Sequence, residues 1–257
     1  MGRTADVDTA IRCADVSISR SGGARVIDGV SFVLSQASTL AVMGPTGAGK
    51  SSLVAALAGS TEDGLGVAGG EAQVCGISVR KKGRSHRVLT YSVGYLEQGA
   101  GSHLPARMTV GEVIGAPITS RDRRVNQKAL AIRVATLLDE MKLPLGAAGK
   151  YPYELSAGMR QRVAFARAVI LQPRLLIADE PLANLDIEVR HVMFEALTAR
   201  RRDAGMAALI VTNDKDFVRE LDADALVLGG GHVVAQGRVQ DTQWTPSASA
   251  KHRLIAS

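Results

Sequence analysis

The stretch Gly44-Pro45-Thr46-Gly47-Ala48-Gly49-Lys50-Ser51 decides the fold, because it matches the phosphate-loop pattern G-x-x-x-x-G-K-[ST] at every fixed position. The apolar run Thr39–Met43 precedes it and predicts a buried parallel strand. Residues 50–58 follow it and predict an apolar helix closed by Gly59. A strand that enters a helix through a glycine-rich loop turns backbone N–H groups toward a phosphate. We therefore expect a nucleoside triphosphate site in an α/β fold.

Each part of this loop has an expected role. Glycines allow the backbone to wrap around a phosphate, and the positive end of the helix faces that phosphate. The Lys50 ammonium is expected to reach the β- and γ-phosphates, and the Ser51 hydroxyl can ligate Mg²⁺. The expected cofactors are therefore ATP and Mg²⁺. The expected nucleotide-binding residues of this segment are Gly44, Pro45, Thr46, Gly47, Ala48, Gly49, Lys50, Ser51 and Ser52.

Asp179 and Glu180 form a second candidate motif, because they follow an apolar run at residues 175–178. A buried strand would deliver both carboxylates to the carboxyl edge of the sheet, where open α/β folds bind ligands. Asp179 would help to hold Mg²⁺ and its water, and Glu180 would act as the general base. A strand followed by an ordinary acidic turn is the alternative, and the phosphate loop upstream disfavours it.

Residues 64–69, Gly-Leu-Gly-Val-Ala-Gly, also fit a nucleotide motif, the dinucleotide fingerprint G-x-G-x-x-G. That fingerprint must follow a strand and open a helix. Here the segment follows an expected helix and precedes an expected strand at residues 72–79. We therefore interpret residues 60–70 as a glycine-rich loop and not as a second nucleotide site.

Composition excludes several classes of protein. The chain has 257 residues, of which 46% are apolar and 22% charged, which is typical of a globular protein with one large domain or a core plus a subdomain. No stretch approaches the ~20 apolar residues of a membrane-spanning helix, and the first ten residues lack the apolar core of a signal peptide. The two cysteines, Cys13 and Cys75, argue against a disulfide framework and fit a reducing compartment.

The formal charge of +6 is spread over basic runs at residues 80–87, 121–124 and 200–202. We interpret these runs as solvated faces and loops, because charge runs usually are. Aromatic residues make up 4% and do not interleave with the basic runs, so a stacking platform for single-stranded nucleic acid is disfavoured.

Apolar spacing predicts strands in the first and last thirds of the chain and helices between them. Further strands are expected around residues 11–18, 30–34, 93–96, 208–211, 225–228 and 233–235. Thr109 and Glu112 have the capping-box spacing of a helix start, residues 130–141 have helical spacing, and further helices are expected to begin at Ser156 and Asp186. Strands alternating with helices indicate a mainly parallel sheet, with the helical middle, about 105–172, inserted into it.

Three further motifs resemble those of ATP-binding cassette (ABC) ATPases and occur in the family's order. Gln98 follows an expected strand, as the family's Q-loop glutamine does. Residues 155–162, Leu-Ser-Ala-Gly-Met-Arg-Gln-Arg, resemble the LSGGQ signature, and residues 183–186, Ala-Asn-Leu-Asp, resemble the D-loop. The resemblance covers about residues 10–240. It implies an α/β fold: a P-loop NTPase (RecA-like) core with an antiparallel β subdomain and an inserted α-helical subdomain.

The resemblance also implies a division of the chain. Residues 1–257 would form a single ABC ATPase domain. Residues 1–97 and 173–240 would form the nucleotide-binding core with the β subdomain, and residues 98–172 the helical subdomain with the signature. Residues 241–257, which are rich in Ser, Ala and Thr, would form a loose tail.

In this family two such domains pack head to tail, with ATP between the phosphate loop of one and the signature of the other. Ser156 would cap the signature helix and, with the Gly158 N–H, donate to a γ-phosphate. Gln98 would lie between the metal and a membrane partner and sense the γ-phosphate. The resemblance thus assigns catalytic roles to Glu180, Asn213 and Gln98, and metal contacts to Ser51, Gln98 and Asp179.

A finer resemblance concerns residues 104–118 and the segments around the signature, residues 151–155 and 158–162. They are similar to the corresponding segments of oligopeptide, dipeptide and nickel importer ATPases. The cysteine-rich C-terminal extension of some members has no counterpart here.

Three departures from the family pattern bear on activity. Asn213 stands where the family usually has a histidine that contacts the γ-phosphate, and asparagine donates only neutral hydrogen bonds. Ala157 replaces the first signature glycine, and its methyl group restricts the backbone. Arg20 stands where an adenine-stacking aromatic is expected; its guanidinium can stack on a base, or it can simply be solvated.

The resemblance therefore predicts a peripheral ATPase subunit on the cytoplasmic side of the cell membrane. It would drive an ABC importer for peptides or a related small solute. Its partners would be a second ABC ATPase subunit, in a homodimer or heterodimer, and transmembrane permease subunits, with no nucleic acid. The alternative is a degenerate nucleotide-binding subunit of a heterodimer with little hydrolysis of its own. A soluble ABC ATPase acting on nucleic acid or ribosomes is a third possibility, but the sequence has neither a second cassette nor a long coiled-coil insertion.

Overall fold

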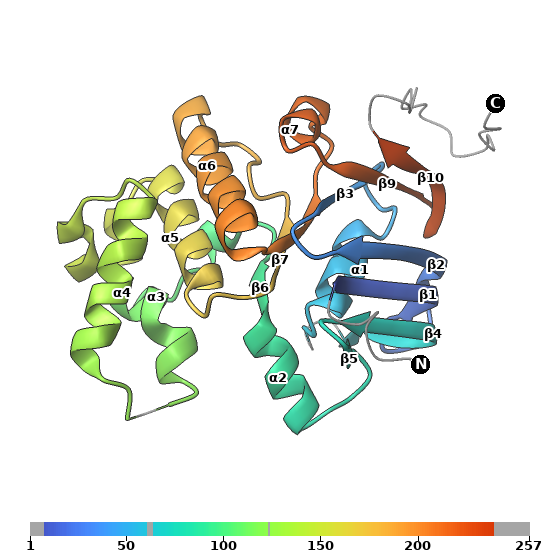
Figure 1. The fold of residues 1–257 in the computed structure, drawn as a ribbon, viewed down its shortest axis with the longest axis horizontal. Helices are drawn as coiled ribbons and strands as arrows, with labels where there is room; N and C mark the ends of the chain where they lie inside the picture. The colour runs from blue at the N-terminus through green and yellow to red at the C-terminus, as the bar shows by residue number, and fades with distance from the viewer. Residues whose placement is uncertain (1–7, 61–63, 123, 239–257) are drawn as a thin grey trace.

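The computed structural model describes residues 8–60, 64–122 and 124–238, which form two β-sheets and a group of helices (Figure 1). Within this part of the chain, the smaller sheet is antiparallel in the order β2-β1-β4-β5, and the larger has the order β10-β9-β3-β8-β7-β6. The smaller sheet contains β1 (Thr9–Ser19), β2 (Arg25–Ser35), β4 (Gly66–Val74) and β5 (Ile77–Ser78). The larger contains β3 (Thr39–Met43), β6 (Val93–Leu96), β7 (Leu175–Asp179), β8 (Ala207–Val211), β9 (Asp224–Gly229) and β10 (His232–Arg238).

The helices begin and end largely at the residues that their caps dictate. They are α1 (Lys50–Leu57), α2 (Arg84–Ser92), α3 (Val110–Thr119), α4 (Gln127–Glu140), α5 (Ala157–Val169), α6 (Ile187–Ala204) and α7 (Lys215–Glu220). Short 3₁₀ turns are η2 (Ala100–Ser102), η3 (Leu145–Gly149) and η4 (Pro152–Glu154). The predicted capping box is confirmed: the Thr109 N–H donates to Glu112 Oε2 at 2.7 Å, and the Glu112 N–H donates to Thr109 Oγ1 at 3.3 Å.

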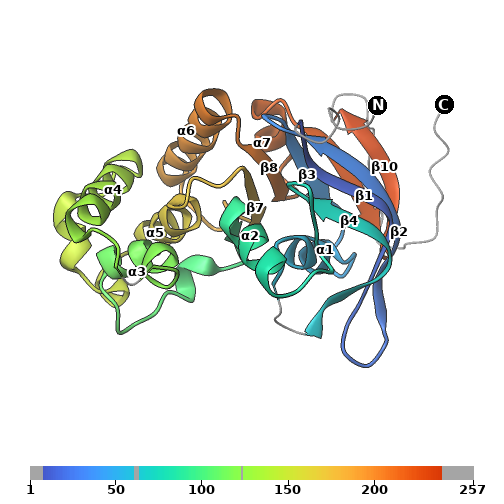
Figure 2. The same ribbon diagram turned by 60° about the horizontal axis from the view of Figure 1, so that its bottom comes forward.

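The larger sheet separates two apolar cores. Strands β3, β7 and β8 are buried along their whole length, and their successive side chains point to opposite faces. Leu40 and Val42 of β3 pack with α1 and the antiparallel sheet, whereas Ala41 and Met43 pack in the core formed with α3–α6. Figure 2 shows these four helices gathered on one side of the molecule and the antiparallel sheet on the other. A continuous apolar run in each of these strands is what burial on both faces requires.

Parallel pairing brings the ends of the three central strands into line. Val42 of β3 pairs with Val211 of β8, and Val211 pairs with Asp179 of β7. The residues that follow these strands therefore emerge together at one edge of the sheet. β9 is also parallel to β3, and only β10 runs antiparallel to its neighbour in this sheet as far as the chain is described.

The structure corrects two expectations. Residues 66–69 belong to β4 and not to a loop, so this strand begins earlier than expected and breaks before β5 at Cys75 and Gly76. The basic run at residues 80–87 leads into α2, an element that apolar spacing did not predict. The predicted tail, 241–257, lies outside the described residues.

The interpretation of residues 200–202 as solvated charge is wrong for two of the three. Arg200 is 16% exposed in its side chain and forms an ion pair with Glu140 of α4 at 2.5 Å. Arg201 Nη1 donates to the Leu221 carbonyl at 2.6 Å. These arginines therefore join α6 to its neighbours, and only Arg202 is largely exposed. In the described parts of the chain, no helix combines the length and apolar character needed to cross a bilayer.

Helix α4 offers a test of the second core. Leu138 is fully buried and Ile132, on the same helix, is 69% exposed. We expect Leu138→Ala to lower the free energy of unfolding by about 2–5 kcal/mol, because it removes buried methyl groups and leaves a cavity. Ile132→Ala should change it by less than about 0.5 kcal/mol. Urea unfolding measured by circular dichroism checks both; equal effects of the two substitutions would contradict the assigned packing.

Candidate nucleotide site

A cavity of about 520 Å³ lies at the carboxyl ends of β3, β7 and β8. It brings together most of the residues that the sequence singled out. Its lining includes Arg20, Thr46, Gly47, Gly49, Lys50, Ser51, Ser52, Gln98, Asp179, Glu180 and Asn213. Gly44, Pro45 and Ala48 belong to the same loop but do not line the cavity, and Ser156 and Gly158 lie outside it. The geometry thus separates one group of expected residues from the signature pair.

The phosphate loop is held by close backbone approaches that only glycine permits. Gly44 has φ +136°, and a Cβ there would lie 2.2 Å from the Leu228 carbonyl oxygen. Gly49 has φ +94°, and a Cβ there would lie 2.6 Å from the Val26 carbonyl oxygen. Both positions combine a left-handed backbone with neighbouring backbone atoms that cannot move aside easily. The loop is therefore shaped by β2 and β9 as well as by its own sequence.

Lys50 closes this loop on itself. Its ammonium Nζ donates to the Gly44 carbonyl at 2.7 Å and to the Pro45 carbonyl at 3.0 Å. Burial lowers the pKa of Lys50, and the nearby Glu180 and Asp179 carboxylates oppose this effect. The residue is 9% exposed and lines the cavity, so the charge is already in place at the cavity wall. A bound phosphate would meet a fixed cation and would not have to order a mobile one.

Asp179 is a buried carboxylate with an unsatisfied oxygen. The residue is 2% exposed, and Oδ1 has no hydrogen-bond partner among the described residues. Burial raises the pKa of Asp179, while a hydrogen bond from Ser51 and the charge of Lys50 lower it. A buried orphan oxygen beside a hydroxyl is the donor set that a hard cation such as Mg²⁺ prefers. The residues present therefore fit a magnesium ion held between Ser51 and Asp179.

Glu180 follows Asp179 at the cavity wall in an unusual backbone conformation. Its φ is +48°, which is uncommon for a residue with a side chain, and its N–H donates to the Val211 carbonyl at 3.0 Å. Burial raises the pKa of Glu180 and the Asp179 charge adds to this, while the Lys50 charge opposes it. A raised pKa strengthens the carboxylate as a base.

Asn213 reaches the phosphate loop through its side chain. Its Oδ1 accepts a hydrogen bond from the Gly44 N–H at 3.0 Å. The amide oxygen is thereby committed to the loop, which leaves the Nδ2 group as the part of Asn213 that can donate to a phosphate. Asn213 is thus anchored to the loop and not merely near it.

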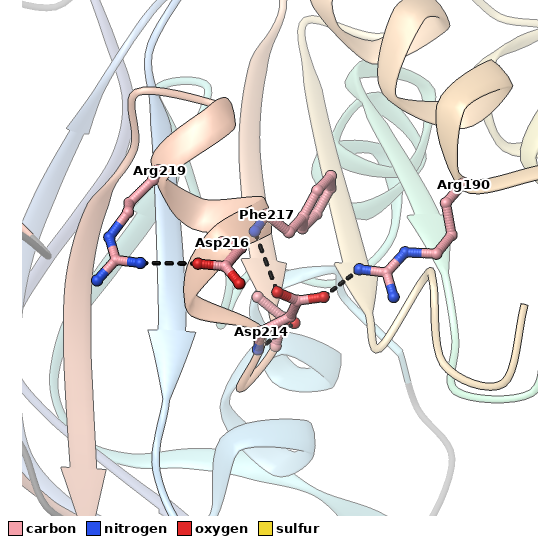
Figure 3. Close-up of polar contacts among 6 residues, drawn as sticks. Arg190, Asp214, Asp216, Phe217 and Arg219 are labelled. Carbon is pink, nitrogen blue, oxygen red and sulfur yellow. Dashed lines mark hydrogen bonds and ion pairs between the residues drawn. The ribbon is translucent and has the colours of Figure 1, made fainter. Parts of the chain in front are cut away.

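The segment that carries Asn213 is fixed by the next residue, Asp214 (Figure 3). Asp214 caps α7 by accepting from the Phe217 N–H at 3.1 Å, and it forms an ion pair with Arg190 of α6. The pKa of Asp214 is lowered: burial acts against this, but the Phe217 N–H and Arg190 outweigh it. Arg190 thereby ties the first turn of α6 to the cavity wall, a contact that no sequence pattern indicated. Phe194 and Phe217 pack edge to face between the same two helices.

The glycine turn between β9 and β10 is a further part of the site that the sequence analysis missed. Gly230 and Gly231 line the cavity. The Gly231 N–H donates to the Ala48 carbonyl at 3.2 Å, and its carbonyl accepts from the Asp28 N–H at 2.9 Å. The run of three glycines at 229–231 was the available signal, because such runs permit close backbone approach.

Arg20 lies at the rim of the cavity, next to a turn. Its N–H donates to the Ala24 carbonyl at 3.1 Å, and the residue is exposed. The guanidinium is therefore free to turn toward a base or toward solvent, and both interpretations of Arg20 stay open predictions.

The signature residues lie on the exposed end of α5. Ser156 caps this helix as predicted, because its Oγ accepts from the Met159 N–H at 3.2 Å. A Cβ on Gly158 would lie 2.8 Å from Val189 Cγ2, so glycine here allows α5 to approach α6 closely. Ser156 is exposed at the helix N-terminus and does not line this chain's own cavity. The pair is available to a ligand or partner outside the cavity.

Comparisons with known proteins agree with this geometry. Residues 27–183 match the family described as ABC transporter. OppD of Mycobacterium tuberculosis, an oligopeptide transport ATP-binding protein, is 30% identical over 239 residues, which cover 92% of this chain and 38% of OppD. OppF of Escherichia coli, of the same description, is 29% identical over 86% of this chain and 66% of its own length. The chain thus spans well under half of OppD and about two thirds of OppF.

Solved structures support the fold. The ATP-binding cassette MJ0796, as a dimer in a post-hydrolysis state bound to ADP and Pi, has a TM-score of 0.79 and 21% identity. The match covers 89% of this chain and 98% of that one. A second cassette, cbiO1 from Clostridium perfringens, has a TM-score of 0.77 and 22% identity. The predicted P-loop NTPase fold is therefore confirmed.

The burial of the Asp179 carboxylate predicts how the stability of the protein depends on pH. Burial raises the pKa of Asp179 in the folded protein above its value in the unfolded chain. As pH rises between these two pKa values, the unfolded chain loses the Asp179 proton before the folded protein does, so the stability of the folded protein falls. We expect Asp179→Asn to raise the melting temperature near pH 8, with a gain that shrinks toward about pH 4. Asp139→Asn, on the exposed face of α4, is the matched control. Calorimetry in the absence of nucleotide measures both; a gain equal at the two pH values would contradict the argument.

Proposed function

The chain belongs to the ABC transporter family, and we propose that it binds and hydrolyses Mg-ATP to drive import of a small solute through separate membrane subunits. One observation carries this proposal: a single cavity unites Lys50, Asp179, Glu180 and Asn213 with the phosphate loop. Lys50 and the loop supply charge for a triphosphate, while Asp179 and Glu180 supply the carboxylates that hydrolysis requires. A passive phosphate-binding turn would not need a buried, unsatisfied aspartate beside it.

The proposed reaction is an in-line attack of water on the γ-phosphorus. The water oxygen forms a bond to that phosphorus while the bond to the β–γ bridging oxygen breaks, which gives ADP and phosphate. Glu180 takes a proton from the water, and Asn213 Nδ2 donates to a γ-phosphate oxygen. Ser51, Asp179 and Gln98 would hold Mg²⁺, which would supply positive charge to the β- and γ-phosphates. The Lys50 ammonium would add to the stabilisation of the same negative charge.

A second ATPase subunit would complete the site. Ser156 and Gly158 lie at the exposed N-terminus of α5, outside this chain's own cavity. In a head-to-tail pair, each subunit's α5 would direct its positive end and the Ser156 hydroxyl to the nucleotide bound by the other. The separation of the signature from the cavity supports this arrangement, whether the partner is identical or different.

A membrane permease is the partner proposed for the groove beside Gln98. This groove, of about 470 Å³, runs between the segment around β6 and helices α3 and α5. Its walls include the apolar residues Leu96, Ala116, Pro117 and Leu171. A short permease helix could dock there, which would place the subunit peripherally on the cytoplasmic face of the membrane. Peptides are the proposed solute class because the OppD and OppF relatives are described as oligopeptide transport proteins.

The alternative is a nucleotide-binding subunit with little hydrolysis of its own. Asn213 is the observation that favours it, because a neutral amide replaces a group that can carry positive charge. In that case a heterodimer partner would supply the faster site. Single-turnover cleavage of ATP by the purified chain separates this alternative from the leading proposal.

Glu180→Gln tests the base directly. We expect kcat for ATP hydrolysis to fall by about 10²–10⁴, the usual contribution of a positioned general base, while Mg-ATP affinity is kept. Glu195→Gln, at an exposed position of α6, is the control and should leave kcat unchanged. Phosphate release and equilibrium nucleotide binding provide the two readouts. The proposal fails if the wild type binds no Mg-ATP or if the two variants behave alike.

Asn213→His tests whether this position limits the rate. A hydrogen bond to a charged group is worth about 1.5–3 kcal/mol, so an imidazole that restores one should raise kcat about ten- to a hundredfold. It should also introduce an inflection in the pH profile near the ordinary pKa of histidine, about 6.5, which the wild type lacks. Brisk turnover by the wild type with no gain in the variant would show that Asn213 does not slow the site.

A further inference from the structure

Gln161 of α5 is a buried polar side chain whose two ends are bound to different segments. The residue is 8% exposed. Its Oε1 accepts from the Gly101 N–H at 3.1 Å, and its Nε2 donates to the Pro181 carbonyl at 2.9 Å. Gly101 lies three residues after Gln98, and Pro181 directly follows Glu180. One side chain on the signature helix therefore contacts both chain segments that leave the candidate site.

The first of these segments is a compact turn. The Ala100 N–H donates to the Glu97 carbonyl at 3.1 Å, and the Ser102 N–H donates to the Gly99 carbonyl at 2.7 Å. These bonds hold residues 97–102 in a compact conformation, because each closes a single turn of backbone. A contact that fixes Gly101 thereby also fixes Gln98 at the cavity.

The second segment is equally short and constrained. The Glu180 N–H is bound to the Val211 carbonyl, and the Ala183 N–H donates to the Glu180 carbonyl at 3.2 Å. With φ at +48°, Glu180 departs from regular backbone immediately after β7. The bond from Gln161 to the Pro181 carbonyl holds the peptide unit between Pro181 and Leu182, one residue beyond Glu180. It thus helps to set the direction in which the Glu180 side chain leaves the strand.

The close approach of Gly101 to α5 requires that it be glycine. A Cβ at Gly101 would lie 2.8 Å from the Gln161 backbone nitrogen and 2.9 Å from its Oε1. Helix α5 is itself anchored at the same level: the Arg162 guanidinium Nη1 donates to the Met141 carbonyl at 3.0 Å. The contact is therefore built into the packing and is not a chance encounter of surface groups.

We propose that Gln161 is a positioning residue that holds the Gln98 and Glu180 segments in register with each other and with the signature helix. The inference rests on the proposed function, because it assigns Gln161 an effect on the hydrolytic step. If the turn that carries Gln98 were displaced, the Gln161 amide would transmit the displacement to the Pro181 carbonyl, one residue after the general base. The side chain would act on catalysis and not on nucleotide affinity, since it does not line the cavity.

An amide satisfies both contacts at any pH. Glutamine accepts with Oε1 and donates with Nε2, whereas an ionised glutamate has no donor for the Pro181 carbonyl. Protonated glutamate regains one O–H donor. Burial and the facing carbonyl favour that protonated form, so the pKa of an introduced carboxyl would lie above its ordinary range. Gln161→Glu should therefore be active at low pH and lose activity as pH rises.

The experiment compares full-length wild type, Gln161→Glu, Gln161→Met and the control Gln127→Glu, whose side chain lies on the exposed side of α4. Steady-state hydrolysis of Mg-ATP is measured between about pH 6 and 9. We expect kcat of Gln161→Met to fall about tenfold, in line with the loss of a buried hydrogen bond, with KM for ATP changed less than about threefold. The ratio of Gln161→Glu kcat to wild-type kcat should decline as pH rises, and that of Gln127→Glu should stay flat.

Each other outcome overturns the inference. A pH-independent ratio for Gln161→Glu, or a loss confined to KM, would show that Gln161 does not position the catalytic segments. If Gln161→Glu does not purify as a folded protein, the kcat and KM of Gln161→Met decide the question alone. If the wild type binds Mg-ATP but does not hydrolyse it, the proposed function is refuted together with this inference. That case is distinguishable, because the wild type and the control Gln127→Glu are then both inactive.

Discussion

The parallel alignment of β3, β7 and β8 is the constraint on which the candidate site depends. Val42, Val211 and Asp179 lie in register, so the first residues after the three strands, Gly44, Thr212 and Glu180, leave the sheet at one edge. Apolar burial on both faces fixes this register, because a shift of one residue would turn every side chain to the wrong core. The chemistry is therefore placed by strand pairing and by apolar packing on the two faces of the sheet.

The polar part of the site is held in a state that folding alone does not favour. A buried lysine and two partly or wholly buried carboxylates share one cavity, and each pays for burial in a shifted pKa. The ion pair of Arg190 with Asp214 and the bond from Asn213 to Gly44 keep the surrounding backbone from relaxing around them. Shifted pKa values of this kind are typical of functional sites, where a ligand supplies the contacts that the protein leaves unmade.

Much of this could be predicted from the sequence where a local rule suffices. Thr39–Met43 and the cap at Ser156 were predicted to the residue, because a short apolar run and an N-cap are local patterns. Residues 66–69 were wrongly assigned to a loop because glycine is rare in strands, and this strand is stabilised by its pairing with β1. Arg190 and Gln161 could not have been found, since their partners are 24 and 20 residues away and only the fold brings them together.

The glycine turn after β9 has a consequence for the order in which the molecule can be made. Gly231 supplies part of the cavity wall and bonds to Ala48, while its carbonyl receives the Asp28 N–H. A chain growing on a ribosome exposes the phosphate loop long before this hairpin exists. Nucleotide therefore cannot help the early segments to fold through the finished cavity, because the turn between β9 and β10 forms one of its walls.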